Sequence, residues 1–169
     1  MTRVAGNVMK YDVLFYANTS ANATPIWSLI GKGVSSFDGA SNPETEDVQY
    51  INEKTKTTTT KSLTPSYTMS MDVIHGDAFN DFMYQMALDQ KTNQKVEICR
   101  VELKNPGDGT NEYRAQKGTY GITIDSFDGG AGGDKVTVGA TFAQEGAVVD
   151  GTFDISSSSE SFTPDSASS

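Results

Sequence analysis

The sequence predicts a mainly β protein, an antiparallel β-sandwich or a partly closed barrel with one flanking α-helix. Segments in which apolar and polar residues alternate recur along most of the chain, and clusters of glycine, asparagine and proline separate them. Only residues 77–90 show the spacing of an amphipathic helix. The 169 residues suit one domain, which we expect to span residues 1–155.

The clearest strand pattern lies in residues 63–73. Four apolar residues alternate there with four polar ones, so one face of the strand should meet the core while the other stays polar. The apolar face consists of Tyr67, Met69, Met71 and Val73. The polar face consists of Ser66, Thr68, Ser70 and Asp72.

Further strands are expected on both sides of this segment. They cover residues 11–17, 26–30, 33–37, 95–103, 113–127, 136–142 and 147–155. In the fourth of these, the apolar set changes phase between Ile98 and Cys99, which predicts either a bulge or burial on both faces. The segment 113–127 is expected to be interrupted near Gly118. The last two segments are expected to form a hairpin around the polar residues 144–146.

The flanking helix is expected at residues 77–90. Its apolar residues recur at intervals of three and four positions and make one stripe that can pack on a sheet. These residues are Phe79, Phe82, Met83, Met86 and Ala87. Asp77 follows Gly76 and is expected to act as the N-cap or as a first-turn acid favoured by the helix dipole.

A long polar stretch, residues 38–62, is predicted to be an interaction loop. It is charged, rich in threonine and nearly free of core-forming residues, and long loops of this kind usually bind a partner. We expect it to become ordered on assembly, with Tyr50 and Ile51 as its apolar anchors. The candidate contact residues are Glu44, Glu46, Asp47, Tyr50, Ile51, Glu53, Lys54, Lys56 and Lys61.

Both ends of the chain are expected to be arms. Residues 1–10 lack a periodic pattern and are predicted to be an N-terminal arm. Residues 156–169 are dominated by serine, and we expect this C-terminal tail to bury too little apolar surface to order itself.

Charge and motif content exclude several functions. The net charge of −9 argues against reading nucleic acid grooves, which needs lysines and arginines on phosphates. His75 and Cys99 are the only residues of their types, so the sequence predicts no catalytic, cofactor or metal site. Residues 129–137 match the nonapeptide of a calcium-binding repeat. The match occurs only once, so a hairpin loop explains it better. No apolar run suits a signal peptide or a membrane span, so we expect a cytoplasmic product.

The order of several short motifs resembles the major tail proteins, or tail tube proteins, of long-tailed bacteriophages (siphophages) of Gram-positive hosts. The run consists of Trp27, then Ile30-Gly31-Lys32-Gly33, Asn42-Pro43-Glu44, residues 49–54 (QYINEK), a threonine-rich stretch and Pro65-Ser66-Tyr67. The likeness is strongest across residues 27–88 and looser in the strands up to Ile155.

This resemblance implies a structural virion protein that is not an enzyme. Subunits of that family form hexameric rings that stack into a hollow tail tube, and DNA passes through without specific binding. The implied partners are a tape-measure protein in the lumen, the tail initiator or distal tail protein and the terminator protein, with no membrane. The polar residues Ser66, Thr68, Ser70 and Asp72 are candidates for the lumen wall. The implied location is the virion, after assembly in the host cytoplasm.

Two other functions remain open from the sequence. One is the inner tube of a contractile tail or of a tail-like bacteriocin, since those proteins are similar in fold. The other, from a different class, is a monomeric carbohydrate-binding or adhesive β-sandwich module, for which Tyr50, Tyr113 and Tyr120 would supply exposed aromatic rings.

Overall fold

A computed structural model describes residues 3–156 and 160–165. In chain order, the elements are η1 (Lys10–Asp12), β1 (Val13–Asn18), β2 (Trp27–Leu29), β3 (Val34–Ala40), β4 (Pro43–Val48), β5 (Thr57–Leu63), β6 (Ser66–Asp72), α1 (Ala78–Asp89), β7 (Gln94–Pro106), β8 (Glu112–Gly129), β9 (Thr137–Asp154) and β10 (Ser161–Pro164).

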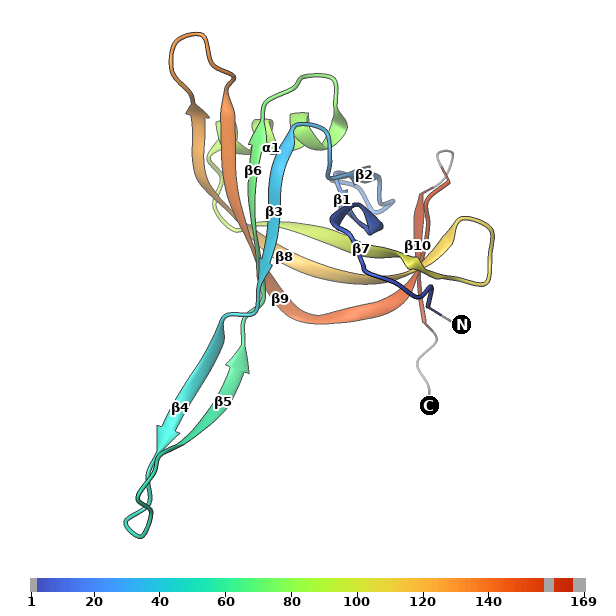
Figure 1. Ribbon diagram of the computed structural model, residues 1–169. Helices are drawn as coiled ribbons and strands as arrows, with labels where there is room; N and C mark the ends of the chain where they lie inside the picture. Colours follow the sequence, from blue (N-terminus) through green and yellow to red (C-terminus); the bar gives the residue numbers. More distant parts are fainter. Residues whose placement is uncertain (1–2, 157–159, 166–169) are drawn as a thin grey trace.

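Eight of the strands form one antiparallel sheet that curls into a half-barrel (Figure 1). The strand order is β2-β1-β7-β8-β9-β6-β3, and β10 pairs with the far part of β9. The end strands β2 and β3 do not pair with each other, so the barrel stays open. Strands β4 and β5 form a separate ribbon. The predicted fold class is confirmed, and of its two forms the partly closed barrel is the one observed.

The sheet carries apolar clusters on both faces, because neighbouring residues of its central strands point to opposite sides. On β7, Val96 and Ile98 belong to the larger cluster with α1, while Cys99 and Val101 belong to the second cluster with Trp27. Ile98 and Cys99 pair without a break with Gly118 and Lys117. Burial on both faces therefore explains the phase change in the sequence.

The predicted hairpin between residues 136–142 and 147–155 is wrong. Both segments belong to one strand, β9, and the true hairpin joins β8 to β9 through residues 130–136. Around Gly146, which has φ +76°, β9 bulges: Lys117 pairs with Val149, but Thr119 already pairs with Glu145. Glycine adopts this conformation without strain, so the polar residues 144–146 interrupt the pairing without ending the strand.

The helix α1 packs on the larger cluster as predicted. The Asp77 carboxylate accepts a hydrogen bond from the Asn80 backbone N–H at 3.0 Å, which confirms the N-cap. Phe79, Met83 and Ala87 are buried, whereas Phe82 and Met86 are only partly covered. α1 is the only α-helix among the described residues.

Part of the predicted C-terminal tail is ordered. β10 pairs antiparallel with residues 151–154 of β9, and Phe162 packs against the second cluster. The expectation that the tail buries too little apolar surface to order is therefore wrong for residues 161–164, because one aromatic side chain and a free strand edge suffice. Residues 1–2, 157–159 and 166–169 of the two predicted arms lie outside the described residues.

Candidate functional site

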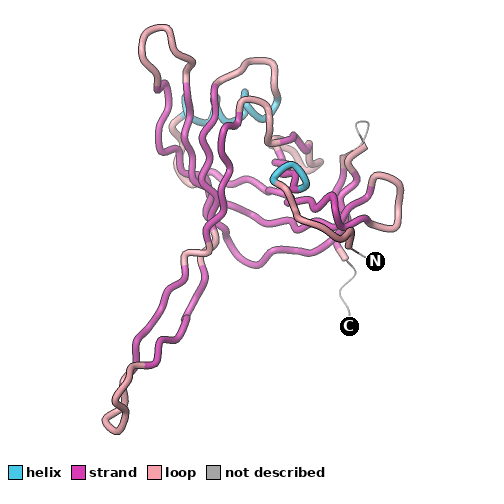
Figure 2. Tube along the Cα trace, viewed as in Figure 1, coloured by secondary structure: helices cyan, strands magenta, loops and turns pink. Residues whose placement is uncertain are grey.

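The predicted interaction loop is a two-stranded ribbon that projects from the half-barrel (Figure 2). β3 extends through Ala40, and β4 then pairs with β5 over the full length of both strands. No residue of β4 or β5 is buried. The predicted loop thus has regular β structure in the single chain, and its further ordering on assembly stays a prediction. The backbone pairs with itself, and threonine, a good strand former, fills most of β5.

Four of the nine predicted contact residues stabilise the ribbon itself. Thr58 donates a hydrogen bond to Asp47 at 2.7 Å, and Ser62 donates one to Glu44 at 2.9 Å. The Lys61 ammonium lies 3.0 Å from the Glu46 carboxylate. These cross-strand contacts explain why a ribbon without a core keeps its register.

The other five predicted contact residues lie at the tip, in residues 49–56. A turn brings the Glu53 N–H to the Tyr50 carbonyl oxygen at 3.0 Å. Tyr50 is 63% exposed, and Ile51 is 108% exposed, as open as in an extended peptide. Within the described residues, neither Lys54 nor Lys56 lies within 4 Å of a carboxylate. The tip therefore presents two apolar side chains, two lysine ammonium groups and the Glu53 carboxylate to solvent.

The base of the ribbon is fixed by a residue that sequence analysis used only as part of a motif. Asn42 adopts φ +43° and donates from its amide to the Thr64 carbonyl oxygen at 3.0 Å and to the Ser66 hydroxyl at 2.8 Å. Thr64 donates back to the Asn42 carbonyl oxygen at 3.1 Å. Asparagine tolerates this left-handed conformation well, and its side chain joins the ribbon to the start of β6.

The polar face of β6 continues across its neighbours. Thr68 pairs with Thr141 of β9, which in turn pairs with Thr123 of β8. The Thr141 hydroxyl donates to the Asp125 carboxylate at 2.6 Å. Further small residues extend the surface beside these; they are Ser66, Ser70, Gly121, Gly139 and Ala143. Strand pairing alone brings the three threonines together, so the sequence pattern of one strand could not reveal this face.

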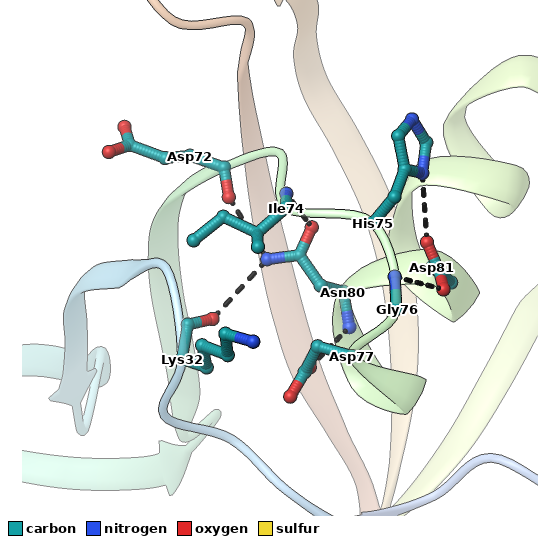
Figure 3. A network of polar contacts seen from close by, with 8 residues as sticks. All are labelled: Lys32, Asp72, Ile74, His75, Gly76, Asp77, Asn80 and Asp81. Atoms are coloured by element: carbon teal, nitrogen blue, oxygen red, sulfur yellow. Dashed lines mark hydrogen bonds and ion pairs between the residues drawn. The ribbon is translucent and has the colours of Figure 1, made fainter.

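One end of the polar face is tied to α1 by a buried amide (Figure 3). The Asn80 side chain accepts from the Ile74 N–H at 2.9 Å and donates to the carbonyl oxygens of Asp72 and Lys32 at 2.9 and 3.3 Å. Asn80 is fully buried. Its three contacts fix the end of β6, the loop before β3 and the start of α1 relative to one another.

The two residues that sequence analysis singled out as lone chemical groups have structural contacts. His75 Nδ1 lies 3.0 Å from the Asp81 carboxylate, which also accepts from the Gly76 N–H. The hydrogen bond from His75, followed by that from Gly76, lowers the pKa of the Asp81 carboxyl. Cys99 is fully buried. Among the described residues, no group of three or more histidine, cysteine or acidic side chains is placed to hold a metal ion.

The three tyrosines considered for an aromatic binding platform do not act together. Tyr120 is buried in the larger cluster, and its ring lies 5.6 Å from that of Tyr67. Tyr113 packs on the second cluster, whereas Tyr50 is on the ribbon. In the part of the chain that the structure describes, no helix is long and apolar enough to cross a membrane.

Solved structures with a similar fold include chains of gene transfer agent particles. A chain in the tail of an empty gene transfer agent particle, determined by helical refinement with C6 symmetry, superposes with a TM-score of 0.56 at 17% identity, covering 84% of this chain and 97% of that chain. A chain in the virion of a native gene transfer agent particle superposes with a TM-score of 0.51 at 17% identity. The match covers 94% of this chain and 99% of that chain. A chain in the 6-fold symmetrised baseplate of the anti-feeding prophage superposes with a TM-score of 0.46 at 7% identity. The match covers 87% of this chain and 97% of that chain.

Sequence comparison adds nothing to this structural likeness. No family model matches the chain, and no curated protein matches it. At 17% identity the likeness concerns the fold, and the chain has the tail tube-like fold of the gene transfer agent chains: a curled antiparallel sheet with one flanking helix.

Proposed function

We propose that this chain is a structural virion protein that polymerises as stacked hexameric rings into a tail tube, a conduit for DNA delivery into a host cell. The observation that carries the proposal is the ribbon β4–β5, which is exposed along its length and ends in an exposed Tyr50 and a fully exposed Ile51. A monomer gains no core from such a ribbon, whereas contact with the next ring would bury its tip.

The fold supports the same proposal. A likeness to the C6-symmetric tail chain agrees with six subunits in a ring, and heterologous contacts between rings extend such an assembly into a filament. The motif order in the sequence favours a long-tailed phage of a Gram-positive host. A tube of this kind would be assembled in the host cytoplasm and would meet a tape-measure protein, an initiator or distal tail protein and a terminator protein.

The polar sheet face suits the wall of such a conduit. The β6 residues Ser66, Thr68 and Ser70, together with Thr123 and Thr141, carry short side chains without positive charge. The Asp125 carboxylate near them repels phosphates, whereas the Asp72 carboxylate is paired with the Lys135 ammonium at 2.7 Å. A face of this composition would let DNA slide, because each lysine or arginine in contact with a phosphate would hold it back.

The test is assembly of a tip variant. Tyr50→Asp together with Ile51→Asp should leave a folded monomer, because neither side chain contributes to the core, and should abolish rings and tubes in negative-stain images. Ile26→Asp is the matched control, since Ile26 is also exposed, at 58%, but lies far from the ribbon in sequence and off the ribbon strands. A wild-type chain that stays monomeric even with its tail initiator, or a tip variant that still forms tubes, would refute the proposal.

A further inference from the structure

A groove beside α1 leaves apolar side chains uncovered. It lies between the C-terminal half of α1, the segment 90–94 and β8, and its volume is about 350 Å³. Met86, Ile122, Ile124 and Phe127 supply its apolar lining. Phe127 is 40% exposed and lies near the end of β8, where residues 125–128 are all exposed.

The groove lies where α1 ends and the chain passes to β7. The helix ends at Asp89, and Gln90 follows in the left-handed conformation with φ 47°, so the chain leaves the helix and reaches β7 at Gln94, which pairs with Ile122 of β8. Ile122 and Ile124 are therefore packed against the larger cluster on one side and only partly buried. An apolar groove with a polar rim is the form that a protein interaction site commonly takes.

Acidic groups predominate beside the groove. Asp128 follows Phe127 and accepts a hydrogen bond from the Tyr84 hydroxyl of α1 at 3.2 Å, with no cation of the described residues within 4 Å. The one lysine of the lining, Lys91, is already paired with Asp89 at 2.9 Å. A partner with exposed apolar residues next to unpaired lysines would match this surface in both respects.

The ribbon tip has this composition and lies at the other end of the molecule. It combines exposed Tyr50 and Ile51 with Lys54 and Lys56, which have no carboxylate partner among the described residues. Figure 1 shows the ribbon projecting from one end of the half-barrel and α1 at the opposite end. Copies stacked in the same orientation would bring the tip of one towards the α1 end of the next, which is a heterologous contact.

We propose that Tyr50 and Ile51 of one copy insert into the groove between α1 and β8 of the next copy, with Lys54 next to its Asp128. This inference rests on the proposed function and adds the receiving surface to it. Each copy offers one tip and one groove, so the contact repeats along a stack without limit. The contact would cover Phe127 and Ile51, two of the exposed large apolar side chains of the free chain.

Site-specific crosslinking tests this contact directly. The full chain carrying a photoreactive benzoylphenylalanine at position 51 is assembled into tubes, irradiated and digested, and the crosslinked peptides are identified by mass spectrometry. Crosslinks to residues 86–94 or 122–127 of a second copy support the proposal. Crosslinks confined to other residues overturn it. A chain labelled at position 26 instead is the control, and it should give no crosslink to the groove.

Substitution in the groove separates this inference from the proposed function. Phe127→Asp should raise the protein concentration needed for polymerisation about tenfold, because it places a carboxylate among the apolar side chains of the contact. Phe127→Ala is a milder second variant that should also raise the protein concentration needed for polymerisation. If the tip variants fail to assemble while both groove variants assemble like wild type, the groove is wrong and the proposed function stands. If the tip variants assemble, the proposed function itself fails.

An exchange of charges tests the proposed contact between Lys54 of one copy and Asp128 of the next. Asp128→Lys should weaken polymerisation, because it places a cation opposite Lys54. Adding Lys54→Asp to the same chain should restore most of the loss if the two side chains meet across the interface. A double variant no better than Asp128→Lys alone would overturn this pairing.

Discussion

The Asn80 side-chain amide lies 2.9 Å from the carbonyl oxygen of Asp72 and joins the helix to the last residue of β6. The same side chain accepts from the Ile74 N–H and donates to the Lys32 carbonyl oxygen, so three backbone groups from two loops and a strand end depend on it. Within the described residues every buried side-chain nitrogen and oxygen has a hydrogen-bond partner, and Asn80 is more deeply buried than Ser28, the other buried polar residue.

Asn80→Ala should therefore destabilise the fold strongly. The substitution leaves a backbone N–H and two carbonyl oxygens without their partner, and leaving buried polar groups unsatisfied costs about 1–3 kcal/mol each. We expect a loss of about 2–4 kcal/mol in the free energy of unfolding, measured by urea denaturation. Asn22→Ala, at an exposed position, should change the free energy of unfolding little. A loss in Asn80→Ala no larger than that of the control would show that water replaces the amide.

Gly151 controls the docking of the C-terminal strand. A Cβ at this position would overlap the Thr163 carbonyl oxygen and would lie 2.7 Å from the Phe162 ring. Gly151→Val should therefore detach β10 while the pairing of β8 with β9 persists. Hydrogen exchange should show loss of protection in residues 161–165. Gly132→Ala, where the added methyl group meets no atom within 4 Å, is the control and should leave this protection intact.

Local patterns in the sequence predicted the features that depend on residues close together in the chain. The alternation in residues 66–72 predicts the observed burial because one face of β6 meets the core, and the helix follows from the spacing of Phe79, Met83 and Ala87. The N-cap at Asp77 was also predictable, since a short polar side chain before an apolar stripe has few other uses. These features depend on residues a few positions apart.

Features that depend on pairing between distant strands could not be predicted in this way. Glycine and polar residues at 144–146 are typical of a turn. However, β9 pairs with the neighbouring strand β8 on both sides of the bulge at Gly146, so the strand continues. The threonine-rich stretch lacks apolar residues, but β4 and β5 can pair because their backbones satisfy each other. The small-residue face arises only when Thr68, Thr141 and Thr123 are placed in register.

Cys99 should be unreactive in the folded protein. Burial raises the pKa of its thiol, because the charged thiolate loses its hydration, and the thiolate is the reactive form. We expect Ellman's reagent at pH 8 to modify the native chain only as fast as it unfolds, and to titrate the single thiol at once in guanidinium chloride. Rapid modification of the native chain at a rate independent of stability would contradict the burial.

The docking of β10 should weaken in acid. Arg114 donates two hydrogen bonds to the Asp165 carboxylate, at 2.8 and 2.6 Å, and these bonds hold the pKa of that carboxyl below its usual value of 3.8. A carboxyl with a lowered pKa in the docked state stabilises that state above pH 3.8, and this contribution is lost as the pH falls through the lowered value. Hydrogen exchange of residues 161–165 should accelerate in that range relative to the core.

Asp165→Asn provides the control for this pH dependence. The variant keeps a polar side chain of the same size but cannot ionise, so its β10 should exchange faster than wild type at neutral pH and change little between pH 5 and pH 3 beyond the intrinsic rate. If wild type and variant respond to acid in the same way, Asp165 is not the titrating group.

A positive charge on the polar sheet face should make the tube retain DNA. Thr68→Lys places a long cation beside Thr141, on a surface of short side chains and carboxylates whose cations, Lys95 and Lys135, are paired with Glu145 and Asp72. Tubes should still form, because Thr68 is exposed and lies outside the apolar clusters and the groove beside α1. In a virion, DNA release should slow, and the delay should shrink as salt rises, since each lysine–phosphate contact contributes a slope of about −0.9 in log K against log salt. Thr59→Lys adds the same charge on the ribbon and should leave the release rate and its salt dependence unchanged. Equal release from both variants and wild type at low salt would place this face outside the path of the DNA.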